Sequence, residues 1–303
     1  MFKRAASLLT LLIAPASFAL NNRSAVSVNG SDLNPCTVAS PCRSFGAAIA
    51  QTNPGGEIVA LDSAGYGPFT ITGTFTVSGA PGVHAAITVP SGTGITINGA
   101  ATDRVTLRNL VLIGTGAASL IQQVQAAEVR VLNCLMRGAG SGIEVDFGRL
   151  AVDHSTILDQ VNNCVYGHSN GTDPVQMTID NSLLEGGITG IYLFARSSAM
   201  VTKCTISGNV TGVYVLSNVG MAVHGMATIE RSTIAYNYYG VYVYAAGMDN
   251  TARAYLAQDE ISYSAVAVTI SGAQGATNVY SFNNNRFTEN VSNGDPLTPI
   301  AFQ

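Results

Sequence analysis

The sequence predicts an all-β protein that folds as a right-handed parallel β-helix, a solenoid, with a short N-terminal capping helix. Three observations predict this fold. A short pattern recurs about every 25 residues, which is a typical solenoid period. Apolar and polar residues alternate within each copy, as in strands with one buried face. The chain also has 32 glycines, no tryptophan and only 11% charged residues, a composition that favours regular β structure with many tight corners.

Residues 1–19 predict a secretory signal peptide. Lys3 and Arg4 precede an apolar run that is too short to span a bilayer. Ser17-Phe18-Ala19 then places small residues where a signal peptidase cuts. We therefore expect a secreted protein, extracellular or in the periplasm or cell envelope, without a membrane span.

Residues 20–55 predict an N-terminal cap. A short helix could begin at Pro41 and run to about Gln51. One face of that helix would be apolar: Phe45, Ala48 and Ile49. In an exported protein, a disulfide between Cys36 and Cys42 is expected, and it would pin the helix over the open first edge of the solenoid.

Residues 56–290 predict the parallel β-helix itself. A clear copy of the repeat reads Val105-Thr106-Leu107-Arg108-Asn109, and the pattern recurs from Val129. Further copies begin at Leu150, Met177, Ala199, Ala227, Ala254 and Tyr280. Successive copies start 21 to 28 residues apart, which indicates loops of variable length. The tail, residues 291–303, is expected to fold back over the far end.

Each copy turns after its first strand and continues into a second strand. That second strand opens on glycine, as in Gly142-Ile143-Glu144-Val145, and we expect the glycine to permit a sharp corner. Coils stacked about 4.8 Å apart place equivalent residues side by side in ladders. Small or hydrogen-bonding residues form the inward ladder at the first turn: Cys134, Ser155, Ser182, Cys204, Ser232, Asp259 and Asn285.

The charge balance disfavours nucleic acid as a partner. Without residues 1–19 the chain has 12 basic and 18 acidic residues, and no basic stripe that could follow a phosphate backbone. Nucleotide-binding, zinc-hydrolase and serine-hydrolase motifs are absent from the sequence, so no cofactor is expected apart from the calcium considered below. Cys134, Cys164 and Cys204 lack metal-ligand spacing and are expected to be buried. The sequence predicts no oligomeric state.

Several segments resemble secreted bacterial right-handed β-helix repeat proteins of the pectin-lyase-like superfamily. The opening matches in Asn29-Gly30-Ser31-Asp32-Leu33-Asn34-Pro35-Cys36, Pro41-Cys42-Arg43-Ser44-Phe45 and Leu61-Asp62-Ser63-Ala64-Gly65-Tyr66-Gly67. The last coil is similar in Ser281-Phe282-Asn283-Asn284-Asn285-Arg286. The resemblance covers nearly the whole mature chain. It implies the fold, whereas an activity has to be argued from the site.

The catalytic motifs of the enzymes in that superfamily do not occur here. Pectate and pectin lyases carry Trp-Ile-Asp-His and Arg-x-Pro-x-x-Arg, and polygalacturonases carry Asn-Thr-Asp, Gly-His-Gly and Arg-Ile-Lys. Gly167-His168-Ser169 and Val223-His224-Gly225 come nearest, and neither has the remaining elements. No catalytic residue is therefore transferred from these families.

An aromatic strip on the second strand is the first candidate site. The alternation points its members outward in two columns: Tyr166, Tyr192, Tyr214 and Tyr242, and, two residues on, Phe194 and Tyr244. The two columns are expected to end at Ala267 and Thr269. Sugar rings stack on exposed aromatic rings, so the strip predicts binding of a polysaccharide or a cell-surface glycan. Alternatively, the rings only stabilise the ladder, as in a structural or adhesive solenoid, or a loop covers them.

Two carboxylates and a histidine lie at one end of this strip: Glu144, Asp146 and His168. If the register holds, Asp146 and His168 meet on neighbouring coils. Such a group could perform acid–base catalysis on a glycosidic or uronate bond, which leaves a polysaccharide lyase or a glycoside hydrolase as an alternative function. An ordinary solvated surface with a chance ion pair is the other interpretation.

Asp153 and Asp180 form a third candidate, on the first strand of adjacent coils. Two carboxylates so close would repel each other or share a cation such as calcium. The alternative is a mixed-charge face in which nearby basic residues neutralise both acids.

Overall fold

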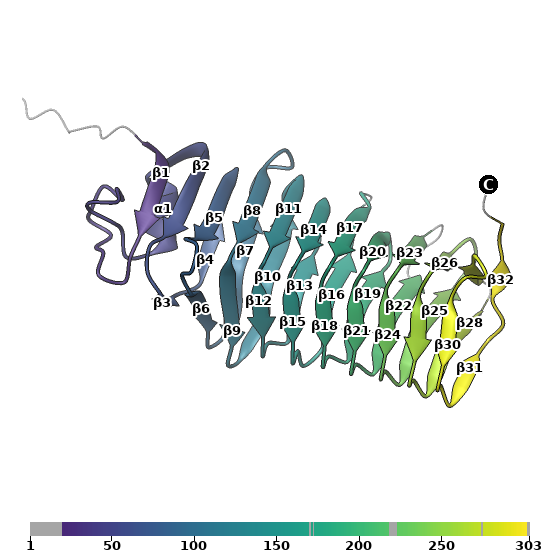
Figure 1. Cartoon of the computed structure of the whole chain (residues 1–303). Helices are drawn as coiled ribbons and strands as arrows, with labels where there is room; N and C mark the ends of the chain where they lie inside the picture. Colours follow the sequence, from purple (N-terminus) through teal and green to yellow (C-terminus); the bar gives the residue numbers. More distant parts are fainter. Residues whose placement is uncertain (1–19, 170, 172, 218–222, 274, 302–303) are drawn as a thin grey trace, which may run out of the picture.

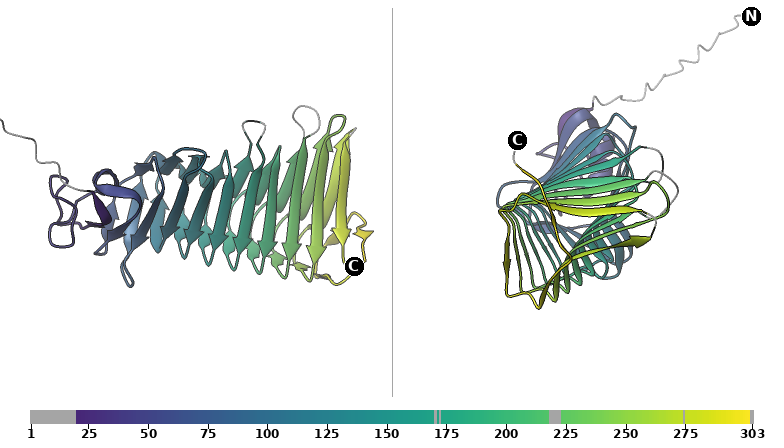
Figure 2. Two further views of the ribbon diagram at one scale, coloured as in Figure 1. Left: turned by 90° about the horizontal axis from the view of Figure 1, so that it is seen from above. Right: turned by 90° about the vertical axis from the view of Figure 1, so that its right-hand side faces the viewer.

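The computed structural model describes residues 20–301 except 170, 172, 218–222 and 274, so the expected signal peptide at 1–19 lies outside the described residues. The chain forms an all-β parallel solenoid in which successive coils contribute strands to three sheets (Figure 1). The view along the axis shows the three sheets around a common interior (Figure 2). No helix within the described residues is long and apolar enough to cross a membrane.

Sheet A contains the first strand of each coil. Its strands in spatial order are β1 (Asn21–Val26), β2 (Thr52–Ala60), β5 (Phe75–Gly79), β8 (Arg104–Arg108), β11 (Glu128–Leu132), β14 (Arg149–Asp153), β17 (Val175–Asp180), β20 (Ser197–Thr202), β23 (His224–Glu230), β26 (Thr251–Ala257), β29 (Ala276–Ser281) and β32 (Thr298–Pro299). All its pairs are parallel.

Sheets B and C complete each coil. Sheet B contains β3 (Ala64–Tyr66), β6 (Ala85–Val89), β9 (Leu110–Gly114), β12 (Leu135–Arg137), β15 (Thr156–Leu158), β18 (Leu183–Glu185), β21 (Thr205–Ser207), β24 (Thr233–Ala235), β27 (Glu260–Ser262) and β30 (Arg286–Thr288). Sheet C contains β4 (Phe69–Ile71), β7 (Gly92–Asn98), β10 (Ala117–Gln125), β13 (Ser141–Val145), β16 (Asn163–His168), β19 (Thr189–Phe194), β22 (Thr211–Ser217), β25 (Tyr239–Ala246), β28 (Val266–Ala273) and β31 (Ser292–Gly294).

The repeat read from the sequence is the coil repeat of the structure. Its inward residues pair from coil to coil and are buried: Leu107, Val131, Val152, Ile179, Val201, Ile229 and Leu256. The last copy was placed one residue too late, because Ala254 pairs with Val279 rather than with Tyr280. The turn after β29 is one residue longer than the turn after β26, which shifts the repeat by one residue there. A shift of one residue exchanges the two faces of a strand.

The turn from sheet A to sheet B is built from left-handed backbone and an inward hydrogen-bond ladder. Non-glycine residues adopt positive φ there: Asn109, Asn133, His154, Asn181, Lys203, Arg231 and Gln258. The next residue points inward, as expected. Cys134 N–H donates to Ser155 Oγ at 3.1 Å, and Ser232 N–H donates to Asp259 Oδ1 at 2.9 Å. Side-chain oxygens of one coil thus accept hydrogen bonds from the buried backbone N–H groups of the coil before it.

The glycine that is the second residue of four sheet C strands has a different role from the one expected. Gly142, Gly190, Gly212 and Gly240 do not have positive φ, which is found instead at the preceding corner. A Cβ on Gly212 would lie 2.6 Å from the Gly240 carbonyl oxygen and 2.9 Å from Ile234 Cγ2. Close packing against the next coil therefore requires glycine in these four strands, whereas Cys164 and Ala267 hold the same position in β16 and β28, and the corner itself does not require glycine.

The N-terminal cap contains α1 (Phe45–Ala50), which lies against β1, β2 and β4. The helix is shorter than expected because Ser44 is its extended N-cap, whose side chain accepts from Ala47 N–H. The expected apolar face is buried: Phe45, Ala48 and Ile49. The Cys36–Cys42 disulfide is present. At the other end, β31 and β32 of the tail pair with β28 and β29.

Candidate functional site

Four tyrosines stand in one outward column on sheet C. Tyr166, Tyr192, Tyr214 and Tyr242 are register neighbours on β16, β19, β22 and β25. Their ring centroids lie 5.0, 5.1 and 4.9 Å apart, with interplanar angles of 22°, 8° and 29°. We call this column the tyrosine ladder. The sequence therefore identified both its members and their contact.

Stacking changes what the ladder offers to a ligand. Tyr192 and Tyr214 each have a neighbouring ring over both faces, so the faces on which a sugar would stack are covered. The rings are half-buried and extend outward from the sheet. In the middle of the ladder, each coil therefore presents one ring edge and one phenolic hydroxyl to solvent. A ligand would meet a row of hydrogen-bonding groups rather than an apolar platform.

The phenolic hydroxyls of Tyr166, Tyr192 and Tyr214 keep their protons over a wide pH range. Burial, together with the neighbouring phenol groups, raises the pKa of Tyr192 and Tyr214 to about 12. Burial also raises the pKa of Tyr166, with Glu144 and Asp146 contributing. A protonated phenol both donates and accepts. Tyr242 shows this capacity, since its hydroxyl lies 3.1 Å from Ser271 Oγ on the next coil.

The second outward column is less regular than expected. Phe194 packs at a tilt against Tyr192, with centroids 6.1 Å apart, whereas Leu216 on the next coil is buried. The expected ends of the two columns were wrong by two residues, because Thr269 pairs with Tyr242 and Ser271 with Tyr244. Ala267 instead occupies the close-packed position held by glycine in earlier coils, and it is buried.

The acidic end of the ladder brings Asp146 and His168 together. His168 Nε2 lies 2.8 Å from Asp146 Oδ1, and Gln122 Nε2 donates to Asp146 Oδ2 at 3.3 Å. The His168 ring also stacks on Tyr166, with centroids 4.7 Å apart. Glu144 is the register neighbour of Tyr166 on the preceding coil. An imidazole oriented by a carboxylate, with a second carboxylate in the neighbouring outward column, is an arrangement that can transfer protons.

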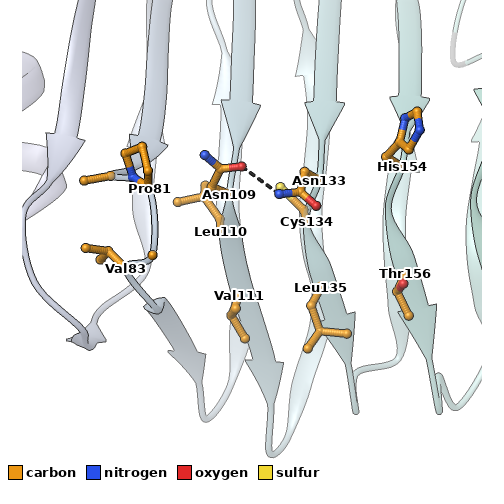
Figure 3. A pocket seen from close by; sticks show the side chains of 12 residues that line it. Pro81, Val83, Asn109, Leu110, Val111, Asn133, Cys134, Leu135, His154 and Thr156 are labelled. Atoms are coloured by element: carbon orange, nitrogen blue, oxygen red, sulfur yellow. Dashed lines mark hydrogen bonds between the residues drawn. The ribbon is translucent and has the colours of Figure 1, made fainter.

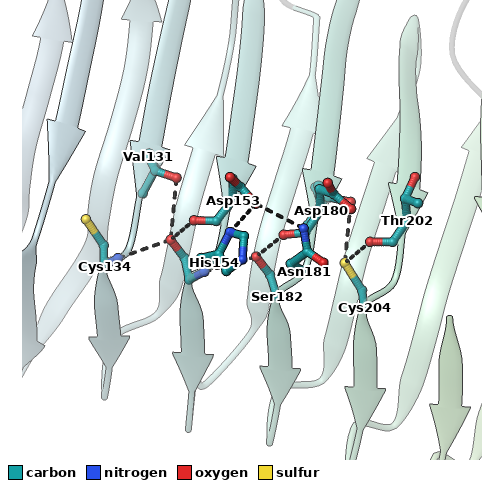
Figure 4. Close-up of polar contacts among 11 residues, drawn as sticks. Val131, Cys134, Asp153, His154, Asp180, Asn181, Ser182, Thr202 and Cys204 are labelled. Carbon is teal, nitrogen blue, oxygen red and sulfur yellow. Dashed lines mark hydrogen bonds and ion pairs between the residues drawn. The ribbon is translucent and has the colours of Figure 1, made fainter.

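Asp153 and Asp180 are register neighbours on β14 and β17, as expected. Figure 4 shows that local groups already engage Asp153: His154 Nδ1 lies 2.7 Å from its Oδ1, and Asn181 Nδ2 donates to the same oxygen at 3.4 Å. Among the described residues, no group of three or more His, Cys, Asp or Glu side chains could hold a metal ion. Calcium takes six to eight oxygen ligands, so this pair would supply a minor share of its shell, and the calcium site stays a prediction.

A groove of about 550 Å³ at the turn from sheet A to sheet B was not foreseen. Figure 3 shows Pro81 and Val83 of a protruding loop on one side of it, and Asn109, Asn133 and His154 along it. Cys134 also borders the groove, and burial raises the pKa of its thiol to about 11, which disfavours the nucleophilic thiolate form. The signal in the sequence that could have indicated this groove is the Pro81-Gly82 turn, which lengthens the connection between β5 and β6.

Comparison with known proteins identifies the fold. The family model described as "Right handed beta helix region" matches residues 93–291. A crystal structure of pectate lyase Pel9A is 15% identical with a TM-score of 0.65, and the match covers 91% of this chain and 79% of that one. An alginate lyase from Paenibacillus sp. str. FPU-7 is 13% identical with a TM-score of 0.64, over 89% of this chain and 99% of that one.

A third similar structure is a GH136 lacto-N-biosidase from Eubacterium ramulus. It is 9% identical with a TM-score of 0.53, over 92% of this chain and 68% of that one. Identities this low show a shared fold and no more. No curated protein sequence matches the chain.

Proposed function

Because this chain belongs to the right-handed β-helix family, we propose that it is a secreted protein that binds a polysaccharide along the tyrosine ladder of sheet C. The observation that carries the proposal is the in-register row of four phenol groups, spaced 4.9 to 5.1 Å apart. Structural relatives named as pectate and alginate lyases support a polysaccharide as the ligand class. The Cys36–Cys42 disulfide is consistent with export.

The spacing of the row suits a sugar polymer that lies along the solenoid axis. Coils repeat about every 4.8 Å, close to the length of one pyranose unit in an extended chain. Each unit can therefore meet one phenol hydroxyl, which donates to or accepts from a sugar hydroxyl. Several modest hydrogen bonds in a fixed row add up because the ladder is already ordered before the ligand arrives.

The charge around the ladder favours a neutral polymer. The sheet C strands from β7 to β28 contain no lysine or arginine. Glu144 and Asp146 stand at one end, where they would repel the carboxylates of a uronate chain. The ladder thus selects hydroxyl-rich, uncharged sugars over acidic ones.

Two triple variants test this binding mode. Tyr192→Phe/Tyr214→Phe/Tyr242→Phe removes three hydroxyls and keeps the stacked rings, and the alanine triple removes both. On a glycan array we expect both variants to lose retention of the ligand of the native protein. Tyr255→Phe/Tyr280→Phe is the matched control, because those rings also stack, with centroids 4.9 Å apart, but on sheet A.

Full retention by the phenylalanine triple with loss in the alanine triple would show stacking rather than hydrogen bonding. Retention by both triples contradicts the proposal and favours a structural or adhesive solenoid whose tyrosines only stabilise the sheet.

Catalysis at the acidic end is a second candidate function, favoured by the 2.8 Å contact between Asp146 and His168. In that function His168, oriented by Asp146, exchanges a proton with a sugar bound on the ladder, and Glu144 serves as the second acid–base group. The protein would then be a polysaccharide lyase or a glycoside hydrolase, and the carboxylates at this end of the ladder favour the hydrolase, because a lyase has to bind a uronate.

A substrate screen distinguishes the two functions. Release of reducing ends or unsaturated uronates, lost in Asp146→Asn and in His168→Gln, supports catalysis. A screen without product from the native protein, together with glycan retention that Asp146→Asn does not change, leaves binding as the function.

A further inference from the structure

Five arginines gather on the outer face of sheet A, in the half of the solenoid near the N-terminus. They come from strands β1, β8, β11 and β14 and lie in three outward columns of the sheet: Arg23, Arg104, Arg108, Arg130 and Arg149. The described chain has 12 basic residues, so this single face holds a large share of them. The sheet C strands that carry the tyrosine ladder hold none.

Two glutamates organise the arginines but do not neutralise them. Glu128 binds Arg104 Nη1 and Arg130 Nε, each at 2.8 Å and each through a different carboxylate oxygen. Glu57 is shared in the same way between Arg108 and Arg23 Nε, the latter at 3.1 Å. These seven side chains carry a formal net charge of +3, and Asp153, which also faces outward on β14, lowers the net charge of the face to +2.

The guanidinium groups retain donors that point to solvent. Each guanidinium has five N–H donors, and the bonds above engage one nitrogen of each. The side chains of Arg104 and Arg130 are 69% and 54% exposed. Arg149 is held differently, since its Nε donates to Gln176 Oε1 at 3.1 Å. The shared glutamates fix these side chains in place, so little rotamer freedom remains to be lost on binding an anion.

Shallow hollows lie between the arginines. One of about 170 Å³ is bounded by Arg104, Glu128 and Arg130, and the next, of about 300 Å³, by Glu128, Arg149 and Gln176. Their floors are small or hydroxyl-bearing side chains of one column: Thr106, Ala151 and Thr178. The two hollows share Glu128, so together they follow the solenoid axis across neighbouring coils.

We propose that this arginine face is a second binding surface, separate from the tyrosine ladder, and that it takes an acidic polysaccharide. Carboxylate is the anion that these guanidiniums already bind, in Glu57 and Glu128. Arg104 and Arg149 lie two coils apart, about 10 Å, so they can meet carboxylates repeated along an extended polymer. The threonine floors match sugar hydroxyls between those carboxylates. The proposal does not depend on the function of the ladder.

Polygalacturonate is the probe that tests the proposal, and its fully methyl-esterified form is the neutral counterpart with the same backbone. The native protein should bind polygalacturonate and not the ester, and the affinity should fall as salt is raised, since exposed charges are screened. Arg104→Gln/Arg130→Gln/Arg149→Gln should weaken binding about tenfold or more. Urea unfolding of each variant shows that the fold is kept.

A matched control removes the same charge elsewhere. Arg137→Gln/Arg231→Gln/Arg286→Gln lowers the net charge equally at sites outside the arginine face, and it should bind polygalacturonate like the native protein. So should the tyrosine-to-phenylalanine triple, which separates this surface from the ladder. The proposal is overturned if both arginine triples lose the same affinity for polygalacturonate. It is also overturned if the native protein binds the ester as well as the acid, or binds neither. Stronger binding of poly-glutamate than of polygalacturonate also overturns it, in favour of an acidic peptide.

Discussion

The rings of Tyr192 and Tyr214 stack with centroids 5.1 Å apart and planes within 8° of parallel. They come from adjacent coils, so their separation is close to the strand spacing of about 4.8 Å. A parallel, in-register sheet therefore holds identical aromatic side chains near their stacking distance without any adjustment of the backbone. The same relationship recurs at Tyr255 and Tyr280 on sheet A, with centroids 4.9 Å apart.

Replacement of Tyr214 separates the stability effect of the ring from that of the hydroxyl. Tyr214→Ala removes two stacked contacts and buried ring area, and it should lower the free energy of unfolding by about 1–2 kcal/mol. Tyr214→Phe keeps both contacts and should change it by less than about 0.5 kcal/mol. Urea unfolding followed by circular dichroism measures both values. An equal loss in the two variants would mean that the hydroxyl stabilises the ladder.

Gly212→Ala tests the close approach between coils. Its Cβ would lie 2.6 Å from a backbone carbonyl oxygen and 2.9 Å from Ile234 Cγ2, so neither neighbour can move away easily. We expect a loss of about 1–3 kcal/mol in unfolding free energy, as in other overpacked interiors. Gly46→Ala in α1 is the control with opposite sign. A Cβ there meets no atom within 4 Å, and the helix should gain up to about 1 kcal/mol.

Asp259→Asn should alter how stability depends on pH. Burial, with a contribution from nearby Glu230, raises the pKa of Asp259 from 3.8 to about 7, although Ser232 and Ala257 N–H groups donate to it. The folded state therefore binds the proton more tightly than the unfolded state. The contribution of Asp259 to stability is present below about pH 4 and is lost as the pH rises toward about 7.

Asparagine carries no charge to bury, and Asn285 already fills the equivalent place one coil on. We expect the stability of Asp259→Asn relative to the native protein to increase between pH 4 and pH 8, measured by urea unfolding at matched ionic strength. A constant difference across this range would show that the carboxyl is ionised throughout.

Loss of the disulfide should affect the cap alone. Cys36 and Cys42 are six residues apart, and closing so small a loop stabilises by about 2 kcal/mol in the chain-entropy model. In Cys36→Ala/Cys42→Ala, amide exchange of α1 and β1 should become faster. Exchange at β19 should not change, because solenoid coils depend on their neighbours. Faster exchange along the whole solenoid would mean that the cap controls global unfolding.

The sequence alone determined the periodic features of the protein. Parallel in-register stacking converts a recurring position into a spatial neighbour, so the repeat was sufficient to predict the sheet, the tyrosine ladder, the inward ladder from Cys134 to Asn285 and the meeting of Asp146 with His168. The prediction failed where the period is interrupted. One extra residue in the last turn shifted the final copy, and Ala267 replaced a glycine at the end of the ladder.

The tertiary structure decided everything that depends on side-chain direction and on contacts between different columns. The repeat names the tyrosines, but the stacking of their rings, which covers their faces, follows from how the side chains leave the sheet. The arginine face has no arginine that repeats from coil to coil, because Glu128 stands between Arg104 and Arg149 in their column, and Arg130 lies in a different column. Glu128 holds Arg104 with Arg130, and Glu57 holds Arg23 with Arg108, and such contacts have no period that a sequence could reveal.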